Sequence, residues 1–440
     1  MSAPARGAAP ARHDPYRALR EAGYRRYLSG NLLGTFGLQM QAVAVGWELY
    51  ERTHSALALG LTGLVQFLPM VLFFLPVGHL VDRYDRKSVV MAAQAGLVLA
   101  ALGLAAVSAW HGPVPLVYAL LFLNGTGRAL LGPSKSALLP EIAPPGAFES
   151  AVAWNSGTWQ LASVLGPAAG GVLLALSRSP GLVYLGHAVL AASFFILLFG
   201  VHPRSTRRAA SIASLDSLLE GARYVLRTRM LLAAITLDLF AVLFGGAVAL
   251  LPIYAKDILH VGPGGLGWLL AAESIGAVST SMILAHLPPL ERAGPALLRA
   301  VALFGLATIV FGLSRSYLLS FIALAVAGAA DSVSVVIRMT LSQLGTPDAL
   351  RGRVSAINSL FIGTSNELGN FESGAVAALA GPVVSVVAGG IGTLVTVAAV
   401  AAKWPEVRAL GRLEESLVGT ASAVNGQRST VPAPANEGHR

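Results

Sequence analysis

Several carboxylates interrupt apolar stretches of this 440-residue chain, and four of them are candidates for chemistry: Asp238, Glu273, Asp331 and Glu367. A charged side chain is costly in apolar surroundings, so a carboxylate placed there readily exchanges a proton. Asp238 is the first candidate for such a proton-binding group, and the other three are alternatives. Glu367 also stands one helical turn before Asn370. This polar cluster is either a proton or cation relay or a contact between helices.

Amide and cationic side chains in other apolar stretches are candidates for binding a polar group of a small-molecule substrate. They are Asn31, Gln39, Asn124 and Arg128, together with Asp331. Asn and Gln side chains also join helices to one another in apolar surroundings, so both interpretations stay open for them.

The sequence lacks the patterns of several common chemistries. It has no Cys, no G-x-x-x-x-G-K-[ST] phosphate-binding loop and no G-x-S-x-G nucleophile motif, and its nine His residues are scattered. Basic and aromatic residues do not interleave as they do in a nucleic-acid-binding surface. We therefore expect no enzyme, no bound metal or cofactor, and no nucleic-acid partner.

The composition indicates a membrane protein. Hydrophobic residues make up 55% of the chain and charged residues 12%, with a mean hydropathy of +0.66, whereas a soluble domain carries about 25% charge. A membrane-spanning helix needs about 20 apolar residues and satisfies its backbone groups internally. Twelve apolar stretches fit: 27–50, 57–80, 88–110, 114–139, 152–176, 181–201, 230–255, 262–287, 296–314, 316–338, 354–380 and 382–403. We predict an all-α membrane protein with twelve transmembrane helices.

Basic residues predict the orientation of these helices. The net charge is +9, and Lys and Arg gather in residues 1–26, 83–87, 204–229, 292–299 and 351–353, which are alternate connections. Cytoplasmic connections carry this excess, so both termini are expected in the cytoplasm. The chain is expected in the cytoplasmic membrane, in contact with lipid and acting as a monomer.

Residues of the two halves repeat at a common spacing. Asn155 and Asn358 are 203 positions apart, and the same spacing joins Gly166 to Gly369 and Gly171 to Gly374. This repeat predicts two six-helix halves, 27–201 and 230–403, related by a pseudo-twofold axis along the membrane normal. We expect residues 1–26 to form a cytoplasmic tail and residues 404–440 to form a disordered cytoplasmic tail. The linker 202–229 has apolar residues at helical spacing, so it is an amphipathic helix on the membrane face or a solvated linker helix.

The connection between the second and third stretches carries a distinctive motif. It runs Gly78-His-Leu-Val-Asp82-Arg83-Tyr-Asp-Arg86-Lys87. This motif resembles the loop signature of the major facilitator superfamily, which implies that fold. In such a loop the carboxylate faces a helix N-terminus and an Arg, and locks the cytoplasmic side. We expect a gate of these residues supported by Arg351 and Arg353; the alternative is that the charges only set the topology.

The fifth stretch contains Gly166-Pro167-Ala-Ala-Gly170-Gly171. It resembles the core of a Gly-Pro signature found in facilitator-type antiporters, although the wider pattern is incomplete because Ala162 replaces a Gly. Pro kinks a helix and Gly permits close helix contact. The motif favours export, and a small-residue packing seam is the alternative.

Three further segments resemble the enterobactin-exporter-like branch of this superfamily. They are residues 128–141, which run RALLGPSKSALLPE, residues 247–252 and residues 346–358. The resemblance implies that the first, fourth, seventh and tenth helices line a central cavity. Arg128 and Asp331 then lie on facing walls, either as a functional pair or as a static packing pair.

These observations predict a secondary transporter that exports an amphipathic, siderophore- or drug-like molecule by proton-coupled alternating access. An uncoupled facilitator or a lysophospholipid-type flippase on the same fold is the alternative. A non-transporting membrane sensor or an enzyme is the remote one.

Overall fold

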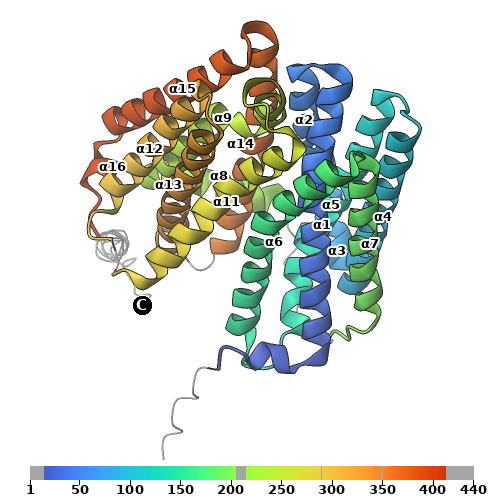
Figure 1. The fold of residues 1–440 in the computed structure, drawn as a ribbon. Helices are drawn as coiled ribbons and strands as arrows, with labels where there is room; N and C mark the ends of the chain where they lie inside the picture. Colours follow the sequence, from blue (N-terminus) through green and yellow to red (C-terminus); the bar gives the residue numbers. More distant parts are fainter. Residues whose placement is uncertain (1–13, 205–214, 289, 348–349, 413–440) are drawn as a thin grey trace, which may run out of the picture. The chain divides into compact units, whose positions relative to one another are not determined.

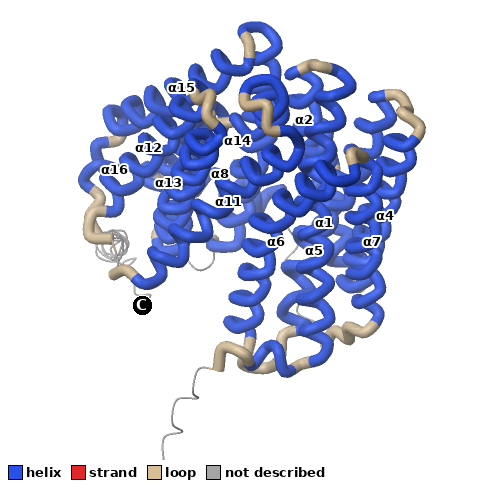
Figure 2. The backbone as a smooth tube through the Cα atoms, in the orientation of Figure 1, coloured by secondary structure: helices blue, strands red, loops and turns tan. Residues whose placement is uncertain are grey.

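The computed structural model describes residues 14–204, 215–288, 290–347 and 350–412, and every regular element in them is helical (Figures 1 and 2). The elements are η1 (Arg17–Arg20), α1 (Ala22–Thr53), α2 (Ala56–Leu72), α3 (Phe74–Arg83), α4 (Arg86–Ala109), α5 (Val114–Ile142), α6 (Phe148–Ser177), α7 (Pro180–Phe199), α8 (Leu215–Arg227), α9 (Arg229–Phe244), η2 (Ala247–Leu250), α10 (Leu251–Ile253), η3 (Tyr254–Ile258), α11 (Gly262–His286), α12 (Ala293–Leu313), α13 (Tyr317–Leu344), α14 (Arg351–Ala380), α15 (Pro382–Lys403) and α16 (Pro405–Ala409).

Each of the twelve apolar stretches falls on one of these helices or on two or more consecutive ones. Within the described residues, nine spans are long and apolar enough to cross a membrane by length and composition. The stretches outside those nine lie on α1, on α2 with α3, and on α14. The second stretch is divided at Phe73 because Pro76 cannot donate to the Leu72 carbonyl and its ring crowds that group.

The chain folds into two compact units. The first unit comprises residues 1–52, 65–213 and 262–271, and the second comprises 53–64, 214–261 and 272–440. Residues of α2 and α11 therefore contribute to both units, whereas the sequence predicts halves that are contiguous in the chain.

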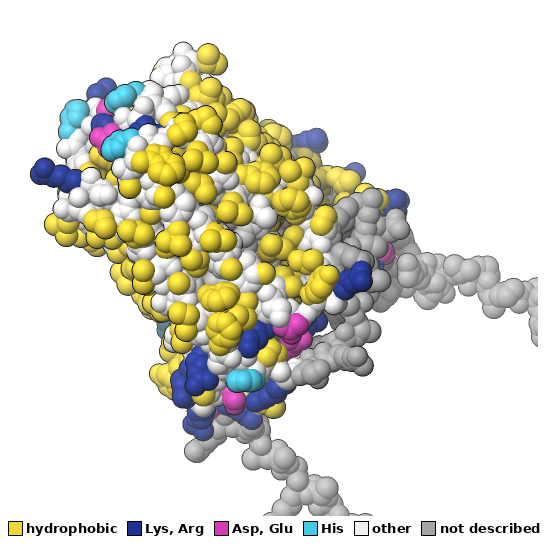
Figure 3. Space-filling model, turned by 90° about the vertical axis from the view of Figure 1, so that its right-hand side faces the viewer, with side chains coloured by type: hydrophobic (Ala, Val, Ile, Leu, Met, Phe, Trp, Pro, Cys, Tyr) yellow, Lys and Arg dark blue, Asp and Glu magenta, His cyan; other side chains and the backbone are white. Residues whose placement is uncertain are grey.

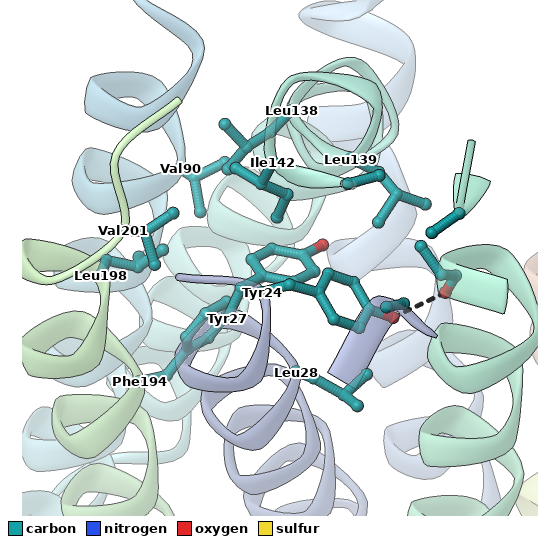
Figure 4. Close-up of a cluster of buried hydrophobic side chains, with 14 residues drawn as sticks. Tyr24, Tyr27, Leu28, Val90, Leu138, Leu139, Ile142, Phe194, Leu198 and Val201 are labelled. Carbon is teal, nitrogen blue, oxygen red and sulfur yellow. Dashed lines mark hydrogen bonds between the residues drawn. The ribbon is translucent and has the colours of Figure 1, made fainter. Parts of the chain in front are cut away.

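In the first unit, α4 packs along both α5 and α7, and α6 also contacts α7. Glycines bring α1 against α7, since a Cβ on Gly37 would lie 2.8 Å from the ring of His187. One apolar cluster closes an end of this bundle, where Tyr24 and Tyr27 are buried beneath α5 (Figure 4). The Tyr24 hydroxyl donates to the Ala151 carbonyl at 2.7 Å, which joins α1 to α6.

In the second unit, α12 packs along α13 and α15, and α9 packs along α14 and α15. The linker helix α8 contacts α14: Val225 is buried with Val354 and Ile357. The Tyr224 hydroxyl also donates to the Gly345 carbonyl at 2.6 Å. The apolar face of α8 is therefore partly covered by protein. The linker residues 205–214 are outside the described part of the chain.

The surface has the pattern expected of a membrane protein. On the face shown in Figure 3, hydrophobic side chains cover a broad band, and charged and His side chains gather at its ends. Exposed residues of the first unit include Leu99, Leu176 and Ile196, which are 62%, 80% and 65% exposed. Large apolar side chains at such exposure are stable where lipid, rather than water, surrounds them.

Candidate functional site

A buried ion pair joins two helices of the second unit. Asp238 on α9 and Arg338 on α13 form a direct salt bridge, and these residues are only 7% and 9% exposed. The second guanidinium nitrogen of Arg338 lies 3.9 Å from Asp331, and its Nε donates to Ser334 at 3.1 Å. Arg338 therefore stands between two carboxylates, one buried and one whose side chain is 42% exposed.

A third carboxylate lies near this pair. Gly328 on α13, one turn before Asp331, packs so closely on the Glu273 backbone of α11 that any Cβ would clash with it. Glu273 and Asp331 are close enough for their charges to interact. Two carboxylates therefore lie beside the Arg338 guanidinium, and the charge of a third, Glu273, acts on one of them, Asp331.

Sequence analysis selected Asp238, Asp331 and Glu273, and it overlooked Arg338. A signal was present, because Arg338 follows Asp331 by seven residues, which is two helical turns along the same face of α13. The predicted stretch 316–338 ends at this residue, and Arg338 was not considered as a partner for Asp331.

The polar cluster of α14 packs against α2 within the second unit. The carboxylate of Glu367 lies 2.7 Å from the Cβ position of Gly63, and the Asn370 carbonyl oxygen lies 3.1 Å from the Cβ position of Gly60. Gly374 meets Gly60 so closely that its Cβ would lie 2.7 Å from the Gly60 Cα. Glu367, Asn370 and Gly374 thus share one helical face, and this face forms a tight helix contact.

The candidates for substrate binding in the first unit lie in different surroundings. Arg128 is exposed, and its guanidinium donates to Gln66 at 3.4 Å. Asn124 is fully buried, and neither atom of its amide has a hydrogen-bond partner among the described residues. Gln39 packs against Gly166, where a Cβ would lie 2.5 Å from that of Gln39. The predicted pairing of Arg128 with Asp331 joins different units and stays a prediction.

Asn31 belongs to a polar cluster that sequence analysis did not assemble. Lys135 on α5 donates to its side-chain oxygen at 2.7 Å, and its amide donates in turn to Asn155 on α6 at 3.1 Å. These three residues line a pocket of about 340 Å³ in the first unit. The other lining residues are Thr35, Ser156, Trp159 and Gln160.

The predicted gate motif spans the end of α3 and the start of α4. Arg86 forms a salt bridge of 2.6 Å with Glu141, and Lys87 donates to the Phe199 carbonyl at 3.3 Å. These contacts fasten the start of α4 to the ends of α5 and α7. Glu141 ends the segment 128–141, and its ion pair with Arg86 was not predicted from the sequence.

Other residues of the motif have fewer contacts. Arg83 is exposed, and the side chain of Asp82 lies outside the described part of the structure, so its role in a gate stays a prediction. A Cβ on Gly78 would meet no described atom within 4 Å. Close packing therefore does not explain this glycine.

The expected support for the gate lies at the start of α14. Arg353 forms a salt bridge with Glu220 of α8, and Arg351 donates to the Gln343 carbonyl at 3.1 Å. Gly221 packs on the Arg353 backbone, where a Cβ would lie 3.0 Å away. The start of α14 is therefore fastened to α8 and to the end of α13 within the second unit.

The Gly-Pro motif of α6 forms close helix contacts. A Cβ on Gly170 would lie 2.7 Å from the Met40 carbonyl oxygen of α1, and one on Gly171 would lie 2.8 Å from the Gly267 Cα of α11. Pro167 lies within the helix between these glycines and Gly166. These close contacts fit a packing seam, and the interpretation of the motif as an export signature stays a prediction.

Among the residues that the structure describes, no group of three or more His, Asp or Glu side chains is placed to hold a metal ion. The polar clusters described above consist of an ion pair, amides and a lysine.

Comparisons with known proteins agree with this architecture. Residues 13–420 match the family described as transmembrane secretion effector. The chain is 30% identical over 395 residues to the enterobactin exporter of Escherichia coli O81, which covers 87% of this chain and 90% of that protein. It is 29% identical to the enterobactin exporter of Shigella boydii serotype 18 over the same shares.

Solved transporter structures have the same fold. A POT family transporter in complex with 5-aminolevulinic acid matches with a TM-score of 0.68 at 13% identity, over 88% of this chain and 97% of that one. A D-xylose-proton symporter matches with a TM-score of 0.64 at 16% identity, over 87% and 97%. These matches confirm the predicted facilitator fold.

The family matched is one of multi-pass membrane transporters, which confirms the prediction that the chain is not an enzyme. The match covers nearly the whole described chain. The chain belongs to the transmembrane secretion effector family of the major facilitator superfamily.

Proposed function

We propose that this transporter exports an amphipathic small molecule, siderophore-like or drug-like, in exchange for protons. The observation that carries the proposal is Arg338, buried between Asp238 and Asp331 inside the second unit. A buried guanidinium that can pair with either of two carboxylates has two states, one for each ion pair. Proton binding to one carboxylate favours the ion pair with the other.

Asp238 is the proposed proton-binding group. When Asp238 is charged, it holds Arg338 in the direct salt bridge. When it takes a proton, the attraction is lost and Arg338 turns to Asp331, whose oxygen is already 3.9 Å away. Because α9 and α13 carry the two partners, the exchange changes how firmly these helices are held together. This change is the proposed link between the proton and alternating access.

The energy of one proton is sufficient for useful export. A charge that crosses a membrane potential of 100 mV gains about 2.3 kcal/mol. At about 1.4 kcal/mol per factor of ten, this energy sustains a roughly 50-fold concentration ratio of a neutral substrate. No ATP is needed.

The relatives support export of a siderophore-like compound, since they are named enterobactin exporters. We propose the cytoplasmic membrane as the location, with both termini in the cytoplasm, because Lys and Arg are concentrated in alternate connections. The gate would comprise Asp82 and Arg83 with the anchored Arg86 and its neighbours. An uncoupled facilitator or a lipid flippase is the competing proposal.

Transport into inverted membrane vesicles tests the proposal. Export from the cell becomes uptake into such vesicles, and an acid interior should drive it. We expect vesicles with the wild-type chain to accumulate enterobactin when the interior is acid. Asp238→Asn should abolish the dependence on the pH gradient, whereas Asp257→Asn, at an exposed carboxylate, should not change it. Uptake by the wild type that ignores the gradient would favour the uncoupled facilitator.

A further inference from the structure

Lys135 is a cation for which the described part of the chain offers no anionic partner. Its ammonium donates to the Asn31 oxygen at 2.7 Å, and no carboxylate among the described residues forms an ion pair with it. An ammonium has three donors, so two of them lack an acceptor in the described structure. Because Lys135 lines a pocket of about 340 Å³, these donors are available to a bound group.

The internal repeat shows what this site lacks. Lys135 and Arg338 are 203 positions apart, which is the spacing of the repeat. Lys135 follows Arg128 by seven residues, and Arg338 follows the equivalent residue, Asp331, by seven. In the second unit the cation has its own counterion, Asp238. In the first unit the equivalent cation donates to the neutral amide of Asn31, which in turn donates to Asn155. A partly buried cation is stabilised by an opposite charge, and none of the described residues supplies one to Lys135.

We propose that Lys135 binds an oxyanion of the transported molecule and that this oxyanion is a substituent of an aromatic ring. The ammonium would form the charge-assisted hydrogen bond, and the Asn155 amide and the Ser156 hydroxyl would bind the remaining oxygen atoms. The indole of Trp159 lines the same pocket and provides the surface on which an aromatic ring packs.

The size of the pocket limits what it holds. Ligand pockets range over about 300–1,000 Å³, and this one is near the lower end. It therefore accepts one aromatic arm of a larger molecule or a small aromatic acid. The inferred ligand is an aromatic carboxylate or phenolate. That this ligand is the transported substrate rests on the proposed export function, whereas the existence of the binding site does not.

Equilibrium binding to the purified full-length protein tests the site without any transport step. Radiolabelled salicylate and its neutral analogue salicylamide are compared at pH 7, with the protein in phosphatidylcholine nanodiscs. A hydrogen bond to a charged group changes affinity by about ten- to a hundredfold. We therefore expect the wild type to bind salicylate at least about tenfold more tightly than salicylamide.

Variants locate the preference. Lys135→Met should reduce the affinity for salicylate to that for salicylamide, and Lys135→Arg should retain the preference. Lys403→Met, at an exposed lysine that ends α15, is the matched control and should bind as the wild type does.

A second variant guards against misfolding of Lys135→Met. Asn31→Asp places a carboxylate where the Lys135 ammonium already donates, so it supplies a permanent counterion and closes the site to anions. The Asn155 amide can turn to donate to the new carboxylate. The proposal is overturned if the wild type has no preference for salicylate, or if the preference survives in Asn31→Asp. Loss of proton coupling in vesicles with intact salicylate binding would contradict the proposed function alone.

Discussion

Removal of the charges of Asp238 and Arg338, singly and together, is the sharpest structural prediction. The two residues come from different helices of the second unit and are 7% and 9% exposed. Removal of one partner from a buried ion pair costs about 3–5 kcal/mol, because the other charge stays buried without compensation. Asp238→Asn and Arg338→Gln should therefore each lower the free energy of unfolding substantially.

The surroundings make the two single variants unequal. After Asp238→Asn, Arg338 still has Asp331 at 3.9 Å, but that side chain is 42% exposed, so solvent screening limits the rescue to about 1 kcal/mol. We expect a loss of about 2–4 kcal/mol for Asp238→Asn and about 3–5 kcal/mol for Arg338→Gln. The double variant carries neither charge and should lose less than the sum of the two, by at least about 2 kcal/mol.

The pH dependence of Arg338→Gln has a predictable sign. Without the guanidinium, Asp238 is a buried carboxylate with no counterion, and proton uptake removes its charge. The loss of stability in this variant should therefore shrink as the pH falls. Asp238→Asn should not show this recovery, because its amide cannot titrate.

The assay is unfolding of the purified protein in mixed detergent micelles, followed by circular dichroism, for the wild type, both single variants and the double variant. Asp257→Asn is the control, since its exposed carboxylate should contribute less than about 1 kcal/mol. Strictly additive losses at Asp238 and Arg338 would refute the ion pair, and so would a loss in Arg338→Gln that grows on acidification.

Three further variants test the other contacts. Glu141→Gln removes the salt bridge with Arg86 and should cost about 1.5–3 kcal/mol of stability, while the double variant with Arg86→Gln should be little worse; additive costs would contradict the contact. Gly170→Ala should lower the melting temperature, because its Cβ would lie 2.7 Å from a carbonyl oxygen, whereas Gly78→Ala meets no described atom and should fold normally; equal behaviour in a thermal melt would contradict the packing seam. Arg353→Gln should increase proteolysis of the linker, since it removes the salt bridge between α8 and α14, and an unchanged cleavage rate would contradict that role.

The sequence alone was sufficient to predict the helical membrane fold. Twelve apolar stretches of about the right length all became helices, because an apolar segment in lipid has few other ways to satisfy its backbone. The polar face of α14 was also predictable, since Glu367, Asn370 and Gly374 follow the helical period.

The partners within the site were harder to predict. The pairing of Asp238 with Arg338 joins residues 100 positions apart on different helices, and helical periodicity does not determine which helices meet. Lys135 lies in the segment 128–141, which resembles the enterobactin-exporter-like branch, and the sequence did not single it out. Its importance depends on Asn31 and Asn155, which α1 and α6 bring to it.

The internal repeat was more informative about the candidate site than the Gly-Pro motif was. It relates Lys135 to Arg338, so the two halves place a cation at the same position and surround it differently. The Gly-Pro motif, in contrast, describes close packing of α6 with α1, which many helical membrane proteins need for other reasons.

Proton movement during transport tests the central claim most directly. The purified protein is reconstituted in vesicles that contain a pH-sensitive dye, and a gradient of enterobactin is applied without a pH gradient. We predict that the wild type moves protons opposite to the substrate and that Asp238→Asn moves none. Movement of the substrate by the wild type with no accompanying change of internal pH would contradict proton-coupled export.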